Sequence, residues 1–143
     1  MILALALGNP IRGDDGAGAA IAAALRGAVP ELEIVESMEA LPEHADAVAR
    51  ARRVVFLDAS AAGRPGEVRV APVTARPPRE SLLHALAPED VLGLARSLHG
   101  RTPPAALVTI AGHDFSFAER LSSEVAASVD EARDRAAAFL RGR

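Results

Sequence analysis

The chain has 143 residues, half of them apolar and 24% charged, a composition typical of one compact domain with a single core. Its formal net charge of −3 argues against a nucleic-acid partner, and the absence of cysteine excludes disulfides, a thiol nucleophile and a thiolate metal site. No apolar stretch approaches the length of a membrane span. We therefore expect one domain over residues 1–143, located in the cytoplasm, with no membrane partner.

The chain opens with a short apolar strand that runs into a glycine-rich turn. Residues 2–7 are all apolar, which is typical of a strand buried on both faces, and residues 8–10 are turn formers that end it. Asp14 and Asp15 then precede an alanine-rich helix that we expect to reach about Ala28. We assign Asp14 to helix capping and loop geometry, a role worth about 1 kcal/mol of stability at most.

The rest of the chain alternates between strand and helix signals. Further strands are expected over residues 32–36, 54–57, 67–71 and 106–110, the third of them at an edge. Helices are expected over residues 41–53 and 88–98, and from Ser122 or Ser123 towards the end of the chain. Residues 72–78 read as an irregular, proline-rich loop. This alternation predicts a three-layer α/β/α sandwich with mostly parallel strands.

The first turn carries the most specific motif. Residues 8–18 read G-N-P-x-x-G-D-D-G-x-G, which resembles the signature loop of the hydrogenase maturation proteases. Those enzymes trim the C-terminus of the large subunit of nickel–iron hydrogenases after nickel insertion. The resemblance extends over residues 58–67 and 106–121, and it implies a five-stranded mixed sheet with the first strand beside the third. Where the family has an Asp-Gly-Gly box after the second strand, residues 36–39 here read Glu-Ser-Met-Glu.

The resemblance also implies a metal-binding and catalytic trio, namely Asp15, Asp58 and His84. Asp15 follows the first strand and Asp58 ends the third, so neighbouring strands would bring their ends to about 5 Å of each other. Close carboxylates either share a proton or neutralise a cation, and a histidine completes a set suited to nickel or zinc. His84 precedes the helix at Pro88, as the family's histidine precedes its own helix. His113, in the loop after the last strand, is the competing third ligand.

Two other histidines are expected to be structural, and two other classes of protein share parts of the first motif. His44 and His99 lie in or beside expected helices, where a structural role is the expectation. Peptidyl-tRNA hydrolases also open with a strand and Gly-Asn-Pro, but they carry a catalytic histidine shortly afterwards and need a basic surface for tRNA. A nucleotide- or phosphate-binding module without catalysis would use the same glycines, yet paired acids oppose a phosphate.

We therefore expect an aspartic-type maturation endopeptidase whose partner is the precursor of a hydrogenase large subunit. The nickel would arrive on that precursor and be gripped by Asp15, Asp58 and His84, and zinc or cadmium could substitute for it. The metal would place a Lewis acid and an activated water beside the bond to be cut.

Overall fold

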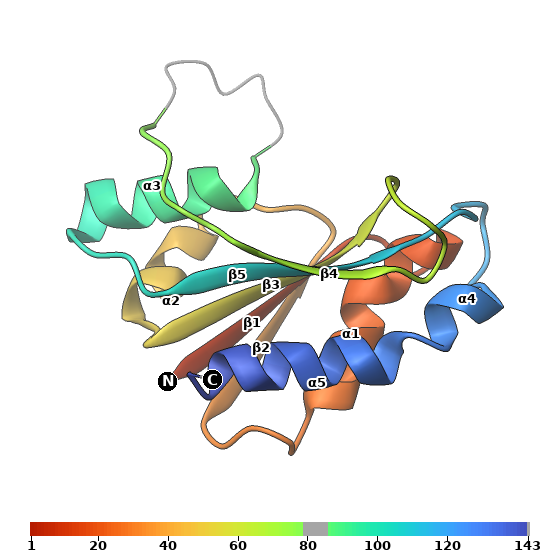
Figure 1. Ribbon diagram of the computed structural model, residues 1–143. Helices are drawn as coiled ribbons and strands as arrows, with labels where there is room; N and C mark the ends of the chain where they lie inside the picture. The colour runs from red at the N-terminus through yellow and green to blue at the C-terminus, as the bar shows by residue number, and fades with distance from the viewer. Residues whose placement is uncertain (79–85, 143) are drawn as a thin grey trace.

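The computed structural model describes residues 1–78 and 86–142, and these form one mixed sheet covered by helices on both faces (Figure 1). The strand order is β2-β1-β3-β5-β4. Four strands run parallel, and β4 pairs antiparallel with β5 at one edge. The strands are β1 Ile2–Leu7, β2 Leu32–Ser37, β3 Arg53–Ser60, β4 Val68–Pro72 and β5 Ala105–Ala111.

The helices divide between the two faces of this sheet. Helices α1 and α5 pack on one face, and α2 and α3 pack on the other. Their bounds are α1 Ala17–Leu25, α2 His44–Arg50, α3 Pro88–His99, α4 Ser123–Ala126 and α5 Val129–Leu140, with a short 3₁₀ turn, η1, at Gly13–Gly16. The predicted three-layer α/β/α sandwich is confirmed, as are the mixed sheet, the edge position of β4 and the placement of β1 beside β3.

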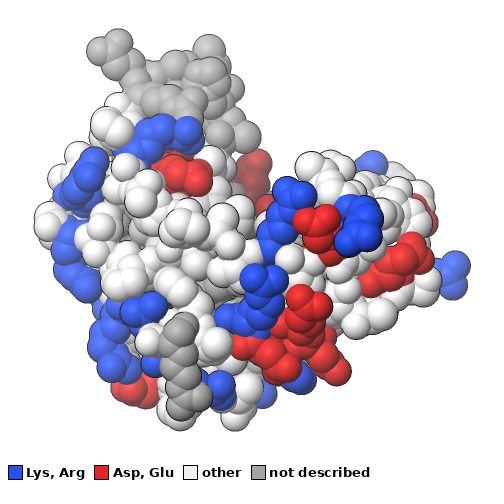
Figure 2. Space-filling view, in the orientation of Figure 1, with Lys and Arg blue, Asp and Glu red and all other residues white. Residues whose placement is uncertain are grey.

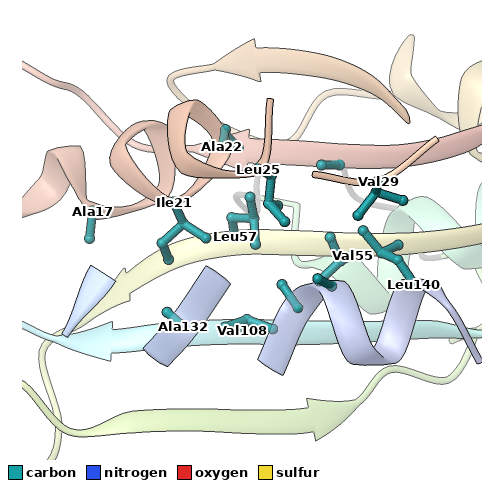
Figure 3. Packing of buried hydrophobic residues seen from close by; sticks show 14 of the residues in the cluster. Ala17, Ile21, Ala22, Leu25, Val29, Val55, Leu57, Val108, Ala132 and Leu140 are labelled. Atoms are coloured by element: carbon teal, nitrogen blue, oxygen red, sulfur yellow. The ribbon is translucent and has the colours of Figure 1, made fainter. Parts of the chain in front are cut away.

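The alternation of residues along β1 explains how closely helix α1 approaches the sheet. Ala4 and Ala6 face α1 and α5, while the larger leucines of β1 face α2 and α3. In the layer drawn in Figure 3, Ile21 of α1 packs with Leu57 of β3 and with residues of α5. At Gly18 a Cβ atom would lie 2.5 Å from the carbonyl oxygen of Leu57 and 2.6 Å from that of Leu7. The start of α1 is therefore pressed directly against the ends of β1 and β3.

Three expected helix boundaries differ from the structure. Helix α1 ends at Leu25 rather than near residue 28, because Gly27 adopts a left-handed conformation with φ of 76°. Helix α2 is shorter than the expected span of residues 41–53, and Arg53 already belongs to β3. The expected long C-terminal helix is interrupted between α4 and α5. At this break the Ser128 hydroxyl donates to the carbonyl oxygen of Gly66 at 2.5 Å, which ties the helical segment to the turn before β4.

An ion pair fixes the start of α3. The guanidinium of Arg76 donates two hydrogen bonds to the Asp90 carboxylate, at 2.8 and 2.7 Å, and Asp90 also accepts the N–H of Ala87 at 2.8 Å. Just before this point Leu86 forms an antiparallel bridge with Ala40, beyond the end of β2. The chain that enters α3 is thereby tied to the edge of the sheet where the parallel strands end.

The surface carries both signs of charge. On the face shown in Figure 2, acidic and basic side chains are intermixed, and neither sign covers the face. Among the described helices, none has the length and apolar character needed to cross a membrane.

Candidate active site

Asp15 lies on η1, immediately beyond the end of β1. Its side chain is half-buried, and its Oδ2 accepts the backbone N–H of Asn9 at 2.7 Å. The turn between them is tight: Gly8 has φ of +116°, and a Cβ atom there would collide with the backbone oxygen of Asp15. Only glycine permits both the conformation and the close approach. The turn therefore brings Asp15 back over the end of the strand that precedes it.

Asp58 lies on the neighbouring strand at the same edge of the sheet. Leu57 is paired with Ala6 of β1, so Asp58 is level with the last residue of that strand. Strand β3 does not end at Asp58, as the sequence suggested, but continues to Ser60 alongside β5. The Asp58 side chain is half-buried, and its Oδ1 accepts the N–H of Ala59 at 2.8 Å.

The two carboxylates influence each other. Burial raises the pKa of Asp58 to about 6, the hydrogen bond from Ala59 opposes that rise, and the charge of Asp15 adds to it. Within residues 1–78 and 86–142, no hydrogen bond or ion pair is recorded to Oδ1 of Asp15 or to Oδ2 of Asp58. Each acid thus keeps one oxygen available, and no basic side chain in this part of the chain balances their charge. Such a pair has the donor chemistry to bind a cation.

His84, the predicted third member of the trio, lies outside the described residues. The described residues contain no group of three His, Asp or Glu side chains that could hold a metal ion, so they supply two acids and no third ligand. The assignment of Asp15, Asp58 and His84 to metal binding and catalysis stays a prediction.

The other three histidines each have a different partner. The Nε2 atom of His113 lies 2.5 Å from Oε2 of Glu124, so its imidazole pairs with that glutamate. His44 accepts a backbone N–H at its Nδ1 in the turn before α2, and His99 lies 3.7 Å from Asp46. The structural roles expected for His44 and His99 agree with these contacts.

The helix-capping role expected for Asp14 is wrong, whereas a role in loop geometry agrees with its contacts. Asp14 does not cap η1 or α1, neither of which has a side-chain cap. Its exposed fraction is 0%, and its carboxylate accepts four hydrogen bonds from residues 113–122, about a hundred positions further along the chain. Burial alone would raise its pKa, but the hydrogen bonds from His113, Ser122 and Asp114 hold that pKa below its ordinary value.

The acid pair sits where ligands bind in open α/β sheets. Strands β2 and β3 lie on opposite sides of β1, so the chain reverses its winding direction between β1 and β3. The carboxyl ends of the strands on either side of such a point form the usual ligand site of this class. The fold and the two acids thus define an open α/β protein with a pair of carboxylates at its switch point.

Comparison with solved structures narrows this class. HybD, a [NiFe] hydrogenase maturation protease from Thermococcus kodakarensis, superposes with a TM-score of 0.74 at 25% identity, over 97% of this chain and 98% of that one. The hydrogenase maturating endopeptidase HybD from E. coli superposes with a TM-score of 0.75 at 24% identity, over 99% of this chain and 92% of that one. The maturation protease HycI from T. kodakarensis KOD1 superposes with a TM-score of 0.73 at 23% identity, over 98% of this chain and 92% of that one. No protein-family model and no curated protein matches the sequence itself.

Over nearly its whole length, then, this chain has the fold of the [NiFe] hydrogenase maturation proteases. The family resemblance drawn from residues 8–18 is confirmed at the level of the fold. The compared structures give no support to the peptidyl-tRNA hydrolase or phosphate-binding alternatives.

Proposed function

We propose that this protein is an endopeptidase that removes the C-terminal extension of a nickel–iron hydrogenase large-subunit precursor, in the cytoplasm, after nickel insertion. The observation that carries the proposal is the acid pair, Asp15 and Asp58, at adjacent strand ends of a fold shared with maturation proteases along almost its entire length. The carboxylates are half-buried, mutually repelling and not balanced by a described basic group, so they favour a cationic substrate group.

In this proposal the cation is nickel held by the precursor, and the protein contributes the ligands that grip it. Asp15 and Asp58 each offer the oxygen that no backbone N–H occupies. His84 is proposed as the third ligand on the strength of the family resemblance. The described chain resumes at Leu86, which is bridged to Ala40 beyond the end of β2.

The reaction is hydrolysis of a peptide bond. Nickel bound at the site would polarise the scissile carbonyl and activate a water molecule. The protein's own task is to hold the precursor's metal between its carboxylates, which orients the adjoining peptide. No thiol is available as a nucleophile, because the chain has no cysteine. Zinc or cadmium, which accept the same oxygen and nitrogen donors, are proposed as substitutes.

The experiment compares nickel-loaded and nickel-free precursor from the same organism, incubated with the protein and followed by the mobility shift of the trimmed subunit. Asp15→Asn and Asp58→Asn each remove one charge and keep the side-chain shape, so both should abolish processing. Asp46→Asn is the matched control, since Asp46 is an exposed aspartate on α2, and it should process normally. Equal cleavage of both precursors, or full activity in either site variant, would overturn the proposed mechanism.

A further inference from the structure

The buried carboxylate of Asp14 joins two segments that lie far apart in the sequence. Its Oδ2 accepts the backbone N–H groups of His113 at 3.0 Å and Asp114 at 3.1 Å, together with the Ser122 hydroxyl at 2.9 Å. Its Oδ1 accepts the backbone N–H of Ser122 at 2.7 Å. One side chain thus holds both ends of the loop between β5 and α4, residues 112–122, which we call the β5–α4 loop.

Backbone hydrogen bonds add to the junction between the turn after β1 and the β5–α4 loop. The N–H of Asp14 donates to the carbonyl of Asp114 at 2.8 Å, and the N–H of Gly13 donates to the carbonyl of Ala118 at 2.9 Å. Ala118 in turn donates to the carbonyl of Ile11 at 3.0 Å. At Gly112 a Cβ atom would lie 2.6 Å from the Cβ of Asp14, so the loop packs directly on this side chain.

The junction matters for the site because Asp14 is next to Asp15. Asp58 is paired with Thr109 of β5 and follows a residue paired with β1, whereas Asp15 stands on a turn outside the sheet. The Asp15 side chain accepts a hydrogen bond from the N–H of Asn9, which belongs to the same turn. Contacts within one turn do not fix where that turn lies, so ties to other segments are needed. The Asp14 carboxylate supplies one of these ties, beside the backbone hydrogen bonds of Gly13 and Ile11 to Ala118.

We propose that Asp14 is a positioning residue: by binding the β5–α4 loop it fixes the turn that carries Asp15 relative to the strand that carries Asp58. The carboxylate is enclosed and does not reach the site itself, since its exposed fraction is 0%. The effect of Asp14 on peptide cleavage rests on the function proposed above, but its effect on the position of Asp15 does not.

Ser122 allows a test that leaves the charge of Asp14 in place. Ser122→Ala removes the hydroxyl that Asp14 accepts, Ser122→Thr keeps a hydroxyl, and Ser123→Ala is the matched control because the Ser123 hydroxyl donates to Glu124 instead. The readout is the backbone N–H of Asn9, which touches Asp15 directly, followed by NMR chemical shift and hydrogen exchange. Exchange at Val55, buried in β3, reports any loss of global stability.

In Ser122→Ala we expect the backbone N–H of Asn9 to exchange several-fold faster and its chemical shift to change. In Ser122→Thr and Ser123→Ala both quantities should stay close to those of the unmodified protein. The exchange rate at Val55 should be unchanged under native conditions. A merely structural role would disturb the β5–α4 loop and leave Asn9 as it was. An Asn9 signal that is identical in all variants would therefore overturn the proposal.

A second measurement links the position of Asp15 to the reaction. Because small misplacements of a site group are costly, Ser122→Ala should lower kcat for cleavage of nickel-loaded precursor roughly tenfold, at a temperature where the variant is fully folded. Ser123→Ala should keep the kcat of the unmodified protein. The Asn9 measurement needs no precursor, so an unmodified protein that cleaves nothing would count against the proposed function alone.

Discussion

Replacing Asp58 by asparagine should stabilise the free protein at neutral pH. The carboxylate is half-buried, and its pKa is raised to about 6 chiefly by that burial, with a further contribution from the charge of Asp15. At neutral pH the fold therefore holds an ionised group that its surroundings disfavour. The asparagine amide in Asp58→Asn would be neutral at every pH, and its oxygen could still accept the N–H of Ala59.

The size of the expected gain in unfolding free energy follows from the shift in the pKa of Asp58. A rise from 3.8 to about 6 is about 2 pH units, and at roughly 1.36 kcal/mol per unit the upper bound is about 3 kcal/mol. Partial access to water lowers this figure, so we expect a gain of about 1–3 kcal/mol for Asp58→Asn above pH 7. The folded pKa lies above the unfolded value, so protonation of Asp58 favours the fold. This contribution is complete below about pH 4 and is lost as the pH rises through about 6.

Urea unfolding of the unmodified protein and of Asp58→Asn, measured in parallel between about pH 4 and pH 8, tests the sign and the window. The difference in unfolding free energy should be smallest near pH 4 and grow to its full value above pH 7. Asp46→Asn, at an exposed position, should show a much flatter difference. A variant that is less stable at pH 8, or a difference independent of pH, would refute the reasoning about burial.

Two further predictions concern packing and metal affinity. Gly18→Ala places a methyl group against the carbonyls at the ends of β1 and β3, so thermal unfolding should show a loss of about 2 kcal/mol, whereas Gly16→Ala, whose nearest neighbour is 3.3 Å away, should lose less. Equal losses would contradict this account of the close approach. Calorimetry should show that the free protein binds zinc weakly, with a dissociation constant far above that of a structural zinc site, because its acids stand on separate elements. Nanomolar affinity would point instead to a resident ion.

The sequence predicted the parts of the fold that local patterns control. The apolar run of residues 2–7 and its glycine turn were enough to locate β1, and the apolar residues 54–57 were enough to locate β3, whereas the site role of Asp58 came from the family resemblance. The neighbouring positions of β1 and β3 came from the family resemblance, because strand order depends on how helices pack across the sheet. The trio of site residues remains a prediction, since His84 lies outside the described residues.

The sequence failed where a distant segment changes the local preference. An aspartate before a helix resembles a cap, and nothing near Asp14 announces partners about a hundred residues away. At the break after α4 the Ser128 hydroxyl likewise has a distant partner, the carbonyl of Gly66, which the local sequence does not indicate. In both cases a hydrogen bond joins segments that only the folded sheet brings together.

Under the proposed function, the charge state of the acid pair would give a physical reason for processing to wait for nickel. With a pKa of about 6, Asp58 is about nine-tenths ionised at pH 7, so little proton release is needed when a cation arrives. The repulsion from Asp15 is a cost that the free protein carries, and no ion pair to either acid is recorded in the described residues. In the proposed mechanism a precursor that carries nickel would relieve this cost on binding, whereas a precursor without nickel would not. Under the proposed function, the burial and the repulsion that disfavour the charge of Asp58 in the free protein make the metal part of the recognition.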